Sequence, residues 1–230
     1  MFYKTHRERM YKFAKLRNFI HLYFIKSLSS KKSMKFDLSQ PIKLENERVI
    51  LRPLEQNDFT YLLLFSENEK DLWNFSLTPA AGAENLQTYI DTALTAKEKL
   101  QAYPFVVFDK HVHKVAGSTR FYDIQITHNV LSLGYTWYGA EFQRMGLNRN
   151  CKYLLLSYAF DVLGVDRVEF QADLRNVKSI QAMKQIGCTQ EGILRSNCSA
   201  SDGRRDSIVL SILKPEWDQK VKTHLQSKLY

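Results

Sequence analysis

Hydrophobic and polar positions recur with a regular spacing along most of this chain, and the spacing predicts the order of its strands and helices. Seven runs have the alternating or continuous apolar character of strands. They cover residues 47–53, 104–108, 115–122, 130–138, 166–171, 188–199 and 205–213. Four runs have apolar residues three and four apart, as amphipathic helices require. The first begins near Asn57, and the others cover residues 86–100, 147–163 and 176–186. The order β-α-α-β-β-β-α-β-α-β-β predicts an α/β (α+β) fold, with a mixed sheet of about seven strands and helices on both faces.

Residues 131–163 form the most informative stretch. Leu131, Leu133, Tyr135 and Trp137 alternate with smaller or polar residues, so they are expected to share one face of a strand. A turn follows this strand and leads into a long amphipathic helix. Because the first N–H groups of a helix lack intrahelical partners, this strand, turn and helix suit an anionic ligand.

The turn itself has residues that favour phosphate binding. Gly146 allows close approach of a ligand to the backbone, and Gln143 and Arg144 can add side-chain donors. The residues alone also permit an ordinary strand-to-helix connection, because glycine is common in turns. Both interpretations stay open at this point.

The net charge of +9 belongs to one end of the chain. Residues 1–35 carry ten Lys or Arg and one Glu, whereas residues 36–230 carry 23 basic and 23 acidic residues. We therefore expect a basic arm over 1–35, a domain over 36–217 and a polar tail over 218–230. The arm is interpreted in three ways: contact with RNA, ribosomes or anionic lipid, a targeting peptide, or sequence upstream of a start at Met34.

Several classes of site are not supported by the sequence. The three cysteines include no Cys-x-x-Cys pair, which argues against a zinc site and a disulfide framework and favours the cytoplasm. His111 and His113 lack a third ligand, so no metal is expected. The longest apolar run of the arm is too short to span a membrane. Nucleotide-binding and hydrolase glycine motifs are missing from the sequence.

Seven stretches together resemble a known family. Gln143-x-x-Gly146-x-Asn148 is similar to the Gln/Arg-x-x-Gly-x-Gly/Ala signature of the GNAT superfamily of N-acetyltransferases, with Asn148 in place of the final small residue. The branch that this chain most resembles is that of the ribosomal-protein N-terminal acetyltransferases. The other matching stretches are Arg52-Pro-Leu54, Gly117-Ser-Thr-Arg-Phe121, Gly134-Tyr-Thr-Trp137, Asn176-x-x-Ser179, Gly187-x-x-x-Glu191-Gly192 and Asp202-Gly-Arg-Arg-Asp206.

The resemblance implies a centrally splayed sheet and transfer of an acetyl group from acetyl-CoA, a co-substrate that needs no metal. It implies a donor site in which the strand contacts the pantetheine, the turn holds the pyrophosphate, and the next helix lies near the thioester. The residues in these three roles are, in order, Thr136, Trp137 and Tyr138; Gln143, Arg144, Met145, Gly146, Leu147 and Asn148; and Asn176 and Ser179. Ser179 is the candidate proton donor to the leaving thiolate, and a strand N–H near Trp137 or Tyr138 is the candidate donor to the oxyanion. The Tyr138 side chain is also a candidate acid or base.

The acceptor half of the reaction is not defined by these motifs. A primary amine is expected, either a peptide N-terminus or a small-molecule amine. Residues 195–198 lack the glutamate that related enzymes place in this region, and Asp123 and Glu141 are weaker candidate bases. A non-catalytic acyl-CoA-binding module is therefore the alternative to an enzyme, and a homodimer is left open.

Overall fold

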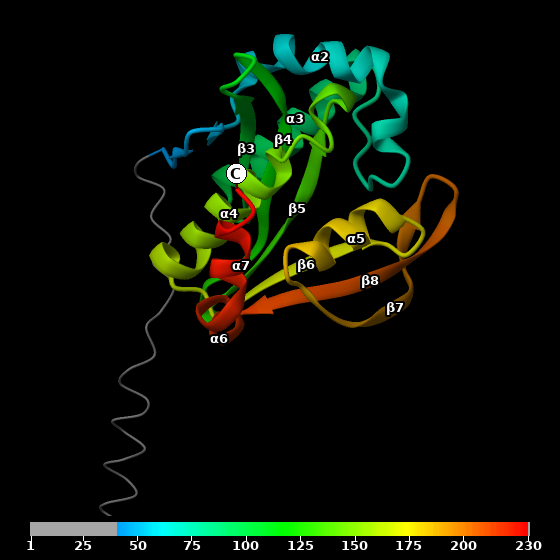
Figure 1. The fold of residues 1–230 in the computed structure, drawn as a ribbon. Helices are drawn as coiled ribbons and strands as arrows, with labels where there is room; N and C mark the ends of the chain where they lie inside the picture. Colours follow the sequence, from blue (N-terminus) through cyan, green and yellow to red (C-terminus); the bar gives the residue numbers. More distant parts are fainter. Residues whose placement is uncertain (1–40, 230) are drawn as a thin grey trace, which may run out of the picture. The chain divides into compact units, whose positions relative to one another are not determined.

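The computed structural model describes residues 41–229, and these contain one eight-stranded sheet (Figure 1). The strand order is β1-β2-β3-β4-β5-β6-β8-β7. The strands are β1 (Leu44–Glu45), β2 (Val49–Pro53), β3 (Ala102–Asp109), β4 (Lys114–Gln125), β5 (Val130–Tyr138), β6 (Arg167–Asp173), β7 (Thr189–Ala200) and β8 (Gly203–Leu213). The seven predicted strands are all present, and the short β1 is the eighth. The predicted arm over 1–35 lies outside the described residues.

The helices follow the predicted order and add several short turns. The main ones are α2 (Phe59–Asn68), α3 (Ala83–Glu98), α4 (Leu147–Ser157), α5 (Val177–Gln185), α6 (Lys214–Glu216) and α7 (Lys222–Gln226). The 3-10 turns are η1 (Gln56–Asp58), η2 (Lys70–Trp73), η3 (Ile126–His128) and η4 (Ala140–Phe142), and the π-helical turns are η5 (Tyr158–Leu163) and η6 (Trp217–Val221). Since η5 continues α4, the helix predicted over 147–163 is confirmed.

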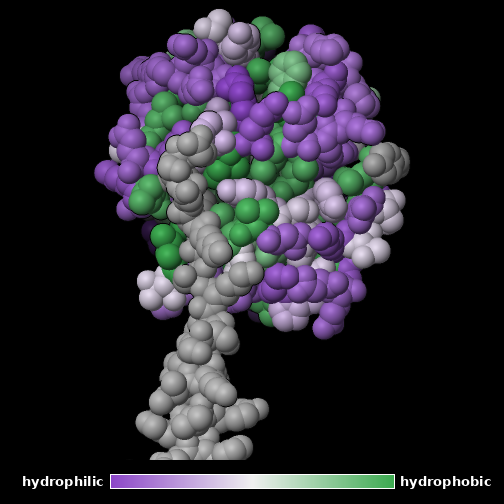
Figure 2. Space-filling model, turned by 90° about the vertical axis from the view of Figure 1, so that its left-hand side faces the viewer, coloured by the Kyte–Doolittle hydropathy of each residue, from purple (hydrophilic) through white to green (hydrophobic). Residues whose placement is uncertain are grey.

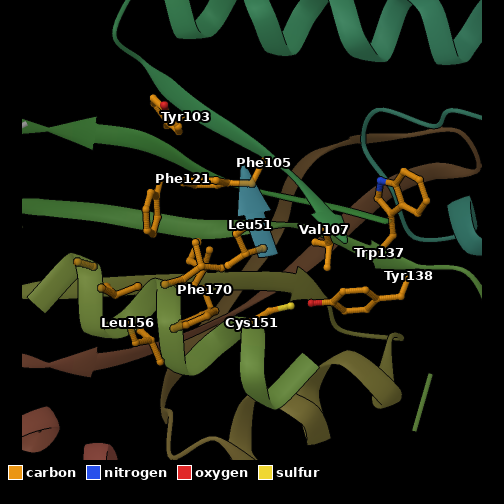
Figure 3. Close-up of a cluster of buried hydrophobic side chains, with 14 of the residues drawn as sticks. Leu51, Tyr103, Phe105, Val107, Phe121, Trp137, Tyr138, Cys151, Leu156 and Phe170 are labelled. Carbon is orange, nitrogen blue, oxygen red and sulfur yellow. The ribbon is translucent and has the colours of Figure 1, made fainter. Parts of the chain in front are cut away.

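The helices cover the sheet from both sides, as the sequence predicts (Figure 1). We call the side of α2 and α3 the α3 face, and the side of α4, α5 and the C-terminal helices the α4 face. Buried apolar side chains from both faces form one core. On the α4 face, Leu51, Phe105, Phe121 and Phe170 gather beneath α4 (Figure 3). This core fixes the position of α4 and so of the turn that precedes it.

The predicted alternation along 130–138 is interrupted, because β5 contains a bulge. Between the pairs Ser118↔Trp137 and Arg120↔Gly134, β5 uses one residue more than β4. Tyr135, at this point, has a left-handed φ of 49°. The prediction that residues 131, 133, 135 and 137 share a face is therefore wrong: Leu131 and Leu133 lie on the α4 face, and Tyr135 and Trp137 on the α3 face. Figure 3 shows Trp137 and Tyr138 leaving β5 in opposite directions.

The segment after residue 213 is part of the fold and not a polar tail. Trp217 and Leu225 are fully buried and Val221 is 2% exposed. The Trp217 indole stacks on Phe160 at 5.5 Å between ring centroids, and its Nε1 donates to Asp161 Oδ1 at 3.0 Å. The apolar residues at 217, 221 and 225 recur every four residues, so they line one side of a helix against α4 and η5.

The surface of the domain mixes polar and apolar groups. In the view of Figure 2, hydrophilic residues cover much of the upper and lower surface and hydrophobic residues gather near the middle. Mixed surfaces of this kind are ordinary for globular domains. Within residues 41–229, no helix has the length and apolar character that a membrane crossing needs.

Candidate active site

The candidate site lies where β5 and β6 separate. These two strands are parallel and pair only over Val130–Ser132 and Arg167–Glu169. Beyond these residues they diverge, as Figure 1 shows. The opposite edge of β6 pairs with β8 along its whole length, and β5 pairs with β4 beyond the bulge. Residues 133–138 and 170–173 therefore border an opening in which main-chain groups of two strands face each other without pairing.

Two helices begin at this opening. Since β5 and β6 are parallel, their carboxyl ends lie at the same edge of the sheet. The turn after β5 leads into α4 at Leu147, and the turn after β6 leads into α5 at Val177. Both helix N-termini thus direct a partial positive charge toward one region. This arrangement suits an extended ligand with amides along its chain and phosphates at one end.

Side-chain hydrogen bonds hold the turn between β5 and α4 in place. Gln143 Nε2 donates to the Tyr138 carbonyl at 2.9 Å. The Tyr138 hydroxyl donates to Asn148 Oδ1 at 3.2 Å and points toward Cys151 on α4 (Figure 3). Burial raises the pKa of Tyr138 well above its ordinary value, so the phenol stays neutral. The strand end and the first turn of the helix are therefore linked before any ligand arrives.

The backbone of the turn is exposed and has an unusual conformation. Arg144 has a φ of 62°, and Gly146, the N-cap of α4, has a φ of 79°. A Cβ at Gly146 would meet only Arg149 Nη2, at 3.9 Å, so the space over this glycine is open. Met145 is 61% exposed, whereas Leu147 is fully buried and anchors the helix. Consecutive N–H groups in such a turn can converge on one anion.

The backbone N–H of Tyr138 points into the opening. The next N–H, that of Gly139, donates to the Ala116 carbonyl of β4 at 3.0 Å. Because successive N–H groups of a strand point to opposite edges, the Tyr138 N–H points away from β4. Its direction suits a donor to an oxyanion or to a ligand amide.

Asn176 and Ser179 lie at the start of α5, at the other side of the opening. Asn176 Oδ1 accepts a hydrogen bond from the Ser179 backbone N–H at 3.0 Å, so Asn176 is the N-cap of this helix. The structure therefore gives Asn176 a local structural role. The Ser179 side chain is half-buried.

Lys152 is a feature of the site that the sequence reasoning missed. This α4 side chain is 5% exposed, and its Nζ donates to Thr136 Oγ1 at 2.8 Å. The same Nζ lies 5.9 Å from the centre of the Phe170 ring on β6. The ammonium is thus placed between the two diverging strands, at the base of the opening. Burial lowers the pKa of Lys152 to about 8.

The α3 face of β4 and β5 carries a second missed feature, the buried guanidinium of Arg120. Trp137 Nε1 donates to the Tyr89 hydroxyl at 3.3 Å, and that hydroxyl donates to Ser118 Oγ at 3.4 Å. Arg120 lies over the Tyr89 ring, next to this chain of hydrogen bonds. A charged residue in the middle of a strand otherwise predicted to be buried is the signal that could have found it.

The carboxylates considered as bases are engaged elsewhere or exposed. Asp123 accepts from Gln125 Nε2 at 2.9 Å, and Glu141 is exposed and lies 3.9 Å from Lys114 Nζ. Glu191 pairs with Arg167, which lowers the pKa of Glu191 to about 2. Within residues 41–229, no group of three or more His, Cys, Asp or Glu side chains could hold a metal ion.

Comparisons with known proteins agree with this geometry. Residues 48–189 match the family model described as an acetyltransferase (GNAT) domain. The chain is 28% identical over 182 residues to the "Probable N-acetyltransferase YjcK" of Bacillus subtilis, a match that covers 76% of this chain and 99% of the relative. It is 26% identical over 181 residues to the "Putative ribosomal N-acetyltransferase YdaF" of the same organism, covering 75% of this chain and 95% of the relative.

A solved structure has the same architecture. The GCN5-related N-acetyltransferase from Brucella melitensis matches with a TM-score of 0.78 and 25% sequence identity, over 87% of this chain and 90% of that chain. The predicted fold class and the resemblance to ribosomal-protein acetyltransferases are confirmed by these matches. The chain therefore belongs to the GNAT family of acetyltransferases and is an N-acetyltransferase.

Proposed function

We propose that this enzyme transfers an acetyl group from acetyl-CoA to a primary amine by direct attack within a ternary complex. The observation that carries the proposal is the opening between β5 and β6. Its two strand edges are unpaired beyond Ser132 and Glu169, and two helices begin at its rim. Pantetheine offers amides that can pair with a strand edge, and pyrophosphate suits a helix N-terminus.

In this proposal the donor is held along one continuous path. The strand residues Thr136, Trp137 and Tyr138 contact the pantetheine, and residues 143–148 bind the pyrophosphate. Gly146 leaves the space above its backbone open, and Arg144 adds a cation to the exposed turn. Asn176 and Ser179 border the thioester from the start of α5.

The chemical step needs an oriented amine, a stabilised oxyanion and a protonated leaving group. The neutral amine attacks the thioester carbonyl carbon, and the carbon–sulfur bond breaks as the tetrahedral intermediate collapses. The Tyr138 N–H donates to the oxyanion, and the Ser179 hydroxyl gives a proton to the leaving thiolate while it takes up a proton from solvent water. Water receives the proton that the amine loses. Holding the two reactants in attack geometry supplies much of the acceleration.

Thiol release tests this proposal directly. The purified protein is mixed with acetyl-CoA and a panel of amines and peptides, and free thiol and acetylated product are measured together. We expect thiol and product in equal amounts, and no acetyl adduct on the protein when acetyl-CoA is supplied alone. An adduct on Cys198 or another side chain would replace direct attack with an acyl-enzyme route.

A non-catalytic acyl-CoA-binding module is the second candidate function. It is favoured by the engagement of Asp123, Glu141 and Glu191, which leaves none of the three as an evident base. Tight binding of acetyl-CoA with no thiol release across the whole panel would support the module and contradict the transferase.

Only the name of a related protein points to a class of acceptor. The relative YdaF is named as a ribosomal N-acetyltransferase, which supports a protein N-terminus as one acceptor class. The homodimer, the cytoplasmic location and an RNA or ribosome contact through residues 1–35 stay predictions. Deleting residues 1–33 should abolish any salt-sensitive association with RNA, and equal binding by the shortened protein would end that hypothesis.

A further inference from the structure

Arg120 is a buried cation held between two aromatic rings. It lies in the middle of β4 and is 3% exposed. Its guanidinium carbon lies 4.7 Å from the centre of the Tyr89 ring and 4.0 Å from the centre of the Tyr135 ring. Attraction between the cation and the ring faces stabilises this arrangement but leaves the N–H groups at the guanidinium edge unused.

The edge of this guanidinium has no partner. Nε and Nη2 of Arg120 are both buried and make no hydrogen bond within residues 41–229. Arginine stays charged at all relevant pH values, so these donors cannot be neutralised by losing a proton. Buried charges in proteins are normally paired and hydrogen-bonded, and leaving them unpaired is costly. The expected counter-ion is therefore a ligand.

The two unpartnered atoms define the shape of that ligand. Nε and Nη2 form one side of the guanidinium fork, and their two N–H bonds are parallel and coplanar. A carboxylate matches this edge with its two oxygens and makes two hydrogen bonds at once.

Two features of the structure position the rings around Arg120. The Tyr89 hydroxyl receives the Trp137 indole N–H and donates to Ser118 Oγ, which fixes the Tyr89 ring. Tyr135 is brought over the guanidinium by its left-handed φ of 49°, a costly conformation for a bulky residue. Strain of this kind is typical of functional sites.

Tyr122 supports the outer ring of this stack. It contacts Tyr135 edge to face at 5.1 Å. A Cβ at residue 134 would lie 2.9 Å from Tyr122 Cε1, so Gly134 makes room for this ring. Three segments of the chain, α3, β4 and β5, thus cooperate to present one guanidinium edge.

Arg120 is also close to the expected point of acetyl transfer. It is the cross-strand partner of Gly134, the residue directly before the bulge. The bulge borders the opening in which the thioester would lie. Arg120 thus lies on the strand next to the bulge that borders this opening.

We propose that Arg120 binds the carboxylate of the acceptor, and that the preferred acceptors are small amino acids or related amines that carry a carboxylate. This inference rests on the proposed acetyl transfer, because it assigns the acceptor side of the same site. Arg120 Nε and Nη2 have almost no accessible surface, so the ring of Tyr135, a residue that is 36% exposed, must move aside from its place over the guanidinium when the acceptor binds.

Matched acceptor pairs test the inference. Each pair consists of an amino acid and its amide, for example glycine with glycinamide and β-alanine with β-alaninamide, so that only the carboxylate changes. The amine of the amide is less basic and is more often neutral, so solution chemistry alone favours the amide. For the wild-type protein we expect kcat/KM to be at least about tenfold higher for the acids. This comparison needs no variant and so does not depend on variant folding.

Substitutions then assign the preference to one side chain. Arg120→Gln should reduce the acid-to-amide ratio to about one or below, while calorimetry gives an unchanged acetyl-CoA affinity. Arg120→Lys keeps the charge but loses the fork, so an intermediate ratio is expected. Lys184→Gln removes an exposed charge on α5 and should keep the wild-type ratio.

A binding experiment separates this inference from the proposed reaction. The same pairs are titrated by calorimetry into the wild-type protein saturated with free CoA, where no transfer can occur. Selective binding of the acids that is lost in Arg120→Gln supports the carboxylate site, whether or not any amine is acetylated. Absence of acetylation in the turnover assay would contradict only the proposed acetyl transfer. Equal binding and equal turnover of acids and amides, or good turnover only with peptides that lack a nearby carboxylate, would overturn the inference.

Discussion

Replacing Lys152 with methionine should stabilise the protein at neutral pH and lose this effect in alkali. The Lys152 side chain is 5% exposed, and its Nζ donates a hydrogen bond to Thr136 Oγ1. Methionine has a similar length and no charge, so Lys152→Met removes the cost of burying an ammonium while the side-chain volume changes little.

The magnitude follows from the pKa of the ammonium. Burial lowers the pKa of Lys152 from 10.5 to about 8. At about 1.4 kcal/mol per pKa unit, the charged form costs about 3 kcal/mol in the folded state. Loss of the hydrogen bond to Thr136 offsets about 1 kcal/mol. Lys152→Met is therefore expected to raise the free energy of unfolding by about 2 kcal/mol at pH 7.

The pH dependence has a definite sign. Between about pH 8 and the ordinary lysine pKa of 10.5, the unfolded chain binds more protons at Lys152 than the folded protein does. In this window the ionisation of Lys152 therefore makes the free energy of unfolding of the wild-type protein increase with pH. The variant lacks this contribution. Cys151 and Cys188 lie near the ammonium, but burial raises the pKa of each to about 12, so they stay neutral there.

Urea unfolding of both proteins from pH 7 to pH 10.5 measures this difference. The gap between variant and wild type should shrink through the window and end slightly in favour of the wild type. Lys184→Met, at an exposed position on α5, should give a curve parallel to the wild type. If Lys152→Met also gives a parallel curve, the ammonium is solvated and its placement at the base of the opening is refuted.

Substitutions at three further positions test the turn, the C-terminal helices and the helix cap. Gly146→Asp and Gly146→Asn both place a side chain at a φ of 79°, so the two variants differ mainly in charge. By calorimetry, Gly146→Asp should weaken acetyl-CoA binding about tenfold more than Gly146→Asn does. Equal affinities of the two variants would remove the turn from the donor site. Trp217→Ala should lower the free energy of unfolding by about 3–5 kcal/mol, and an unchanged value would mean that the C-terminal helices are dispensable. Asn176→Ala should cost about 1 kcal/mol and speed hydrogen exchange of the Ser179 amide, whereas unaltered exchange contradicts the cap.

Local patterns were sufficient to predict most of the architecture. The strands 104–108, 115–122 and 130–138 form the expected antiparallel meander as β3, β4 and β5, because their apolar character and turns are encoded locally. The helix after the turn follows from its apolar stripe for the same reason. The donor-site residues 136–148 are contiguous, so one motif was enough to predict that they lie together.

The remaining features depend on contacts between distant segments. The left-handed Tyr135 cannot be found from the alternation of β5, because its position is set by Arg120 and Tyr122 on β4. Lys152 has a lowered pKa because segments distant in the sequence bury its ammonium in the fold. The C-terminal helix is different, because its apolar residues 217, 221 and 225 recur every four residues in the sequence itself. The prediction of a polar tail gave more weight to the polar residues between them.

Hydrogen exchange with and without acetyl-CoA shows whether the donor binds in the opening between β5 and β6. We expect acetyl-CoA to slow amide exchange in two segments that line this opening, residues 135–150 and 174–180. The outer strands β1, β2 and β7 should exchange as in the free protein. Protection confined to other segments, or no protection at acetyl-CoA concentrations that support acetyl transfer, would contradict a donor site built on this strand, turn and helix.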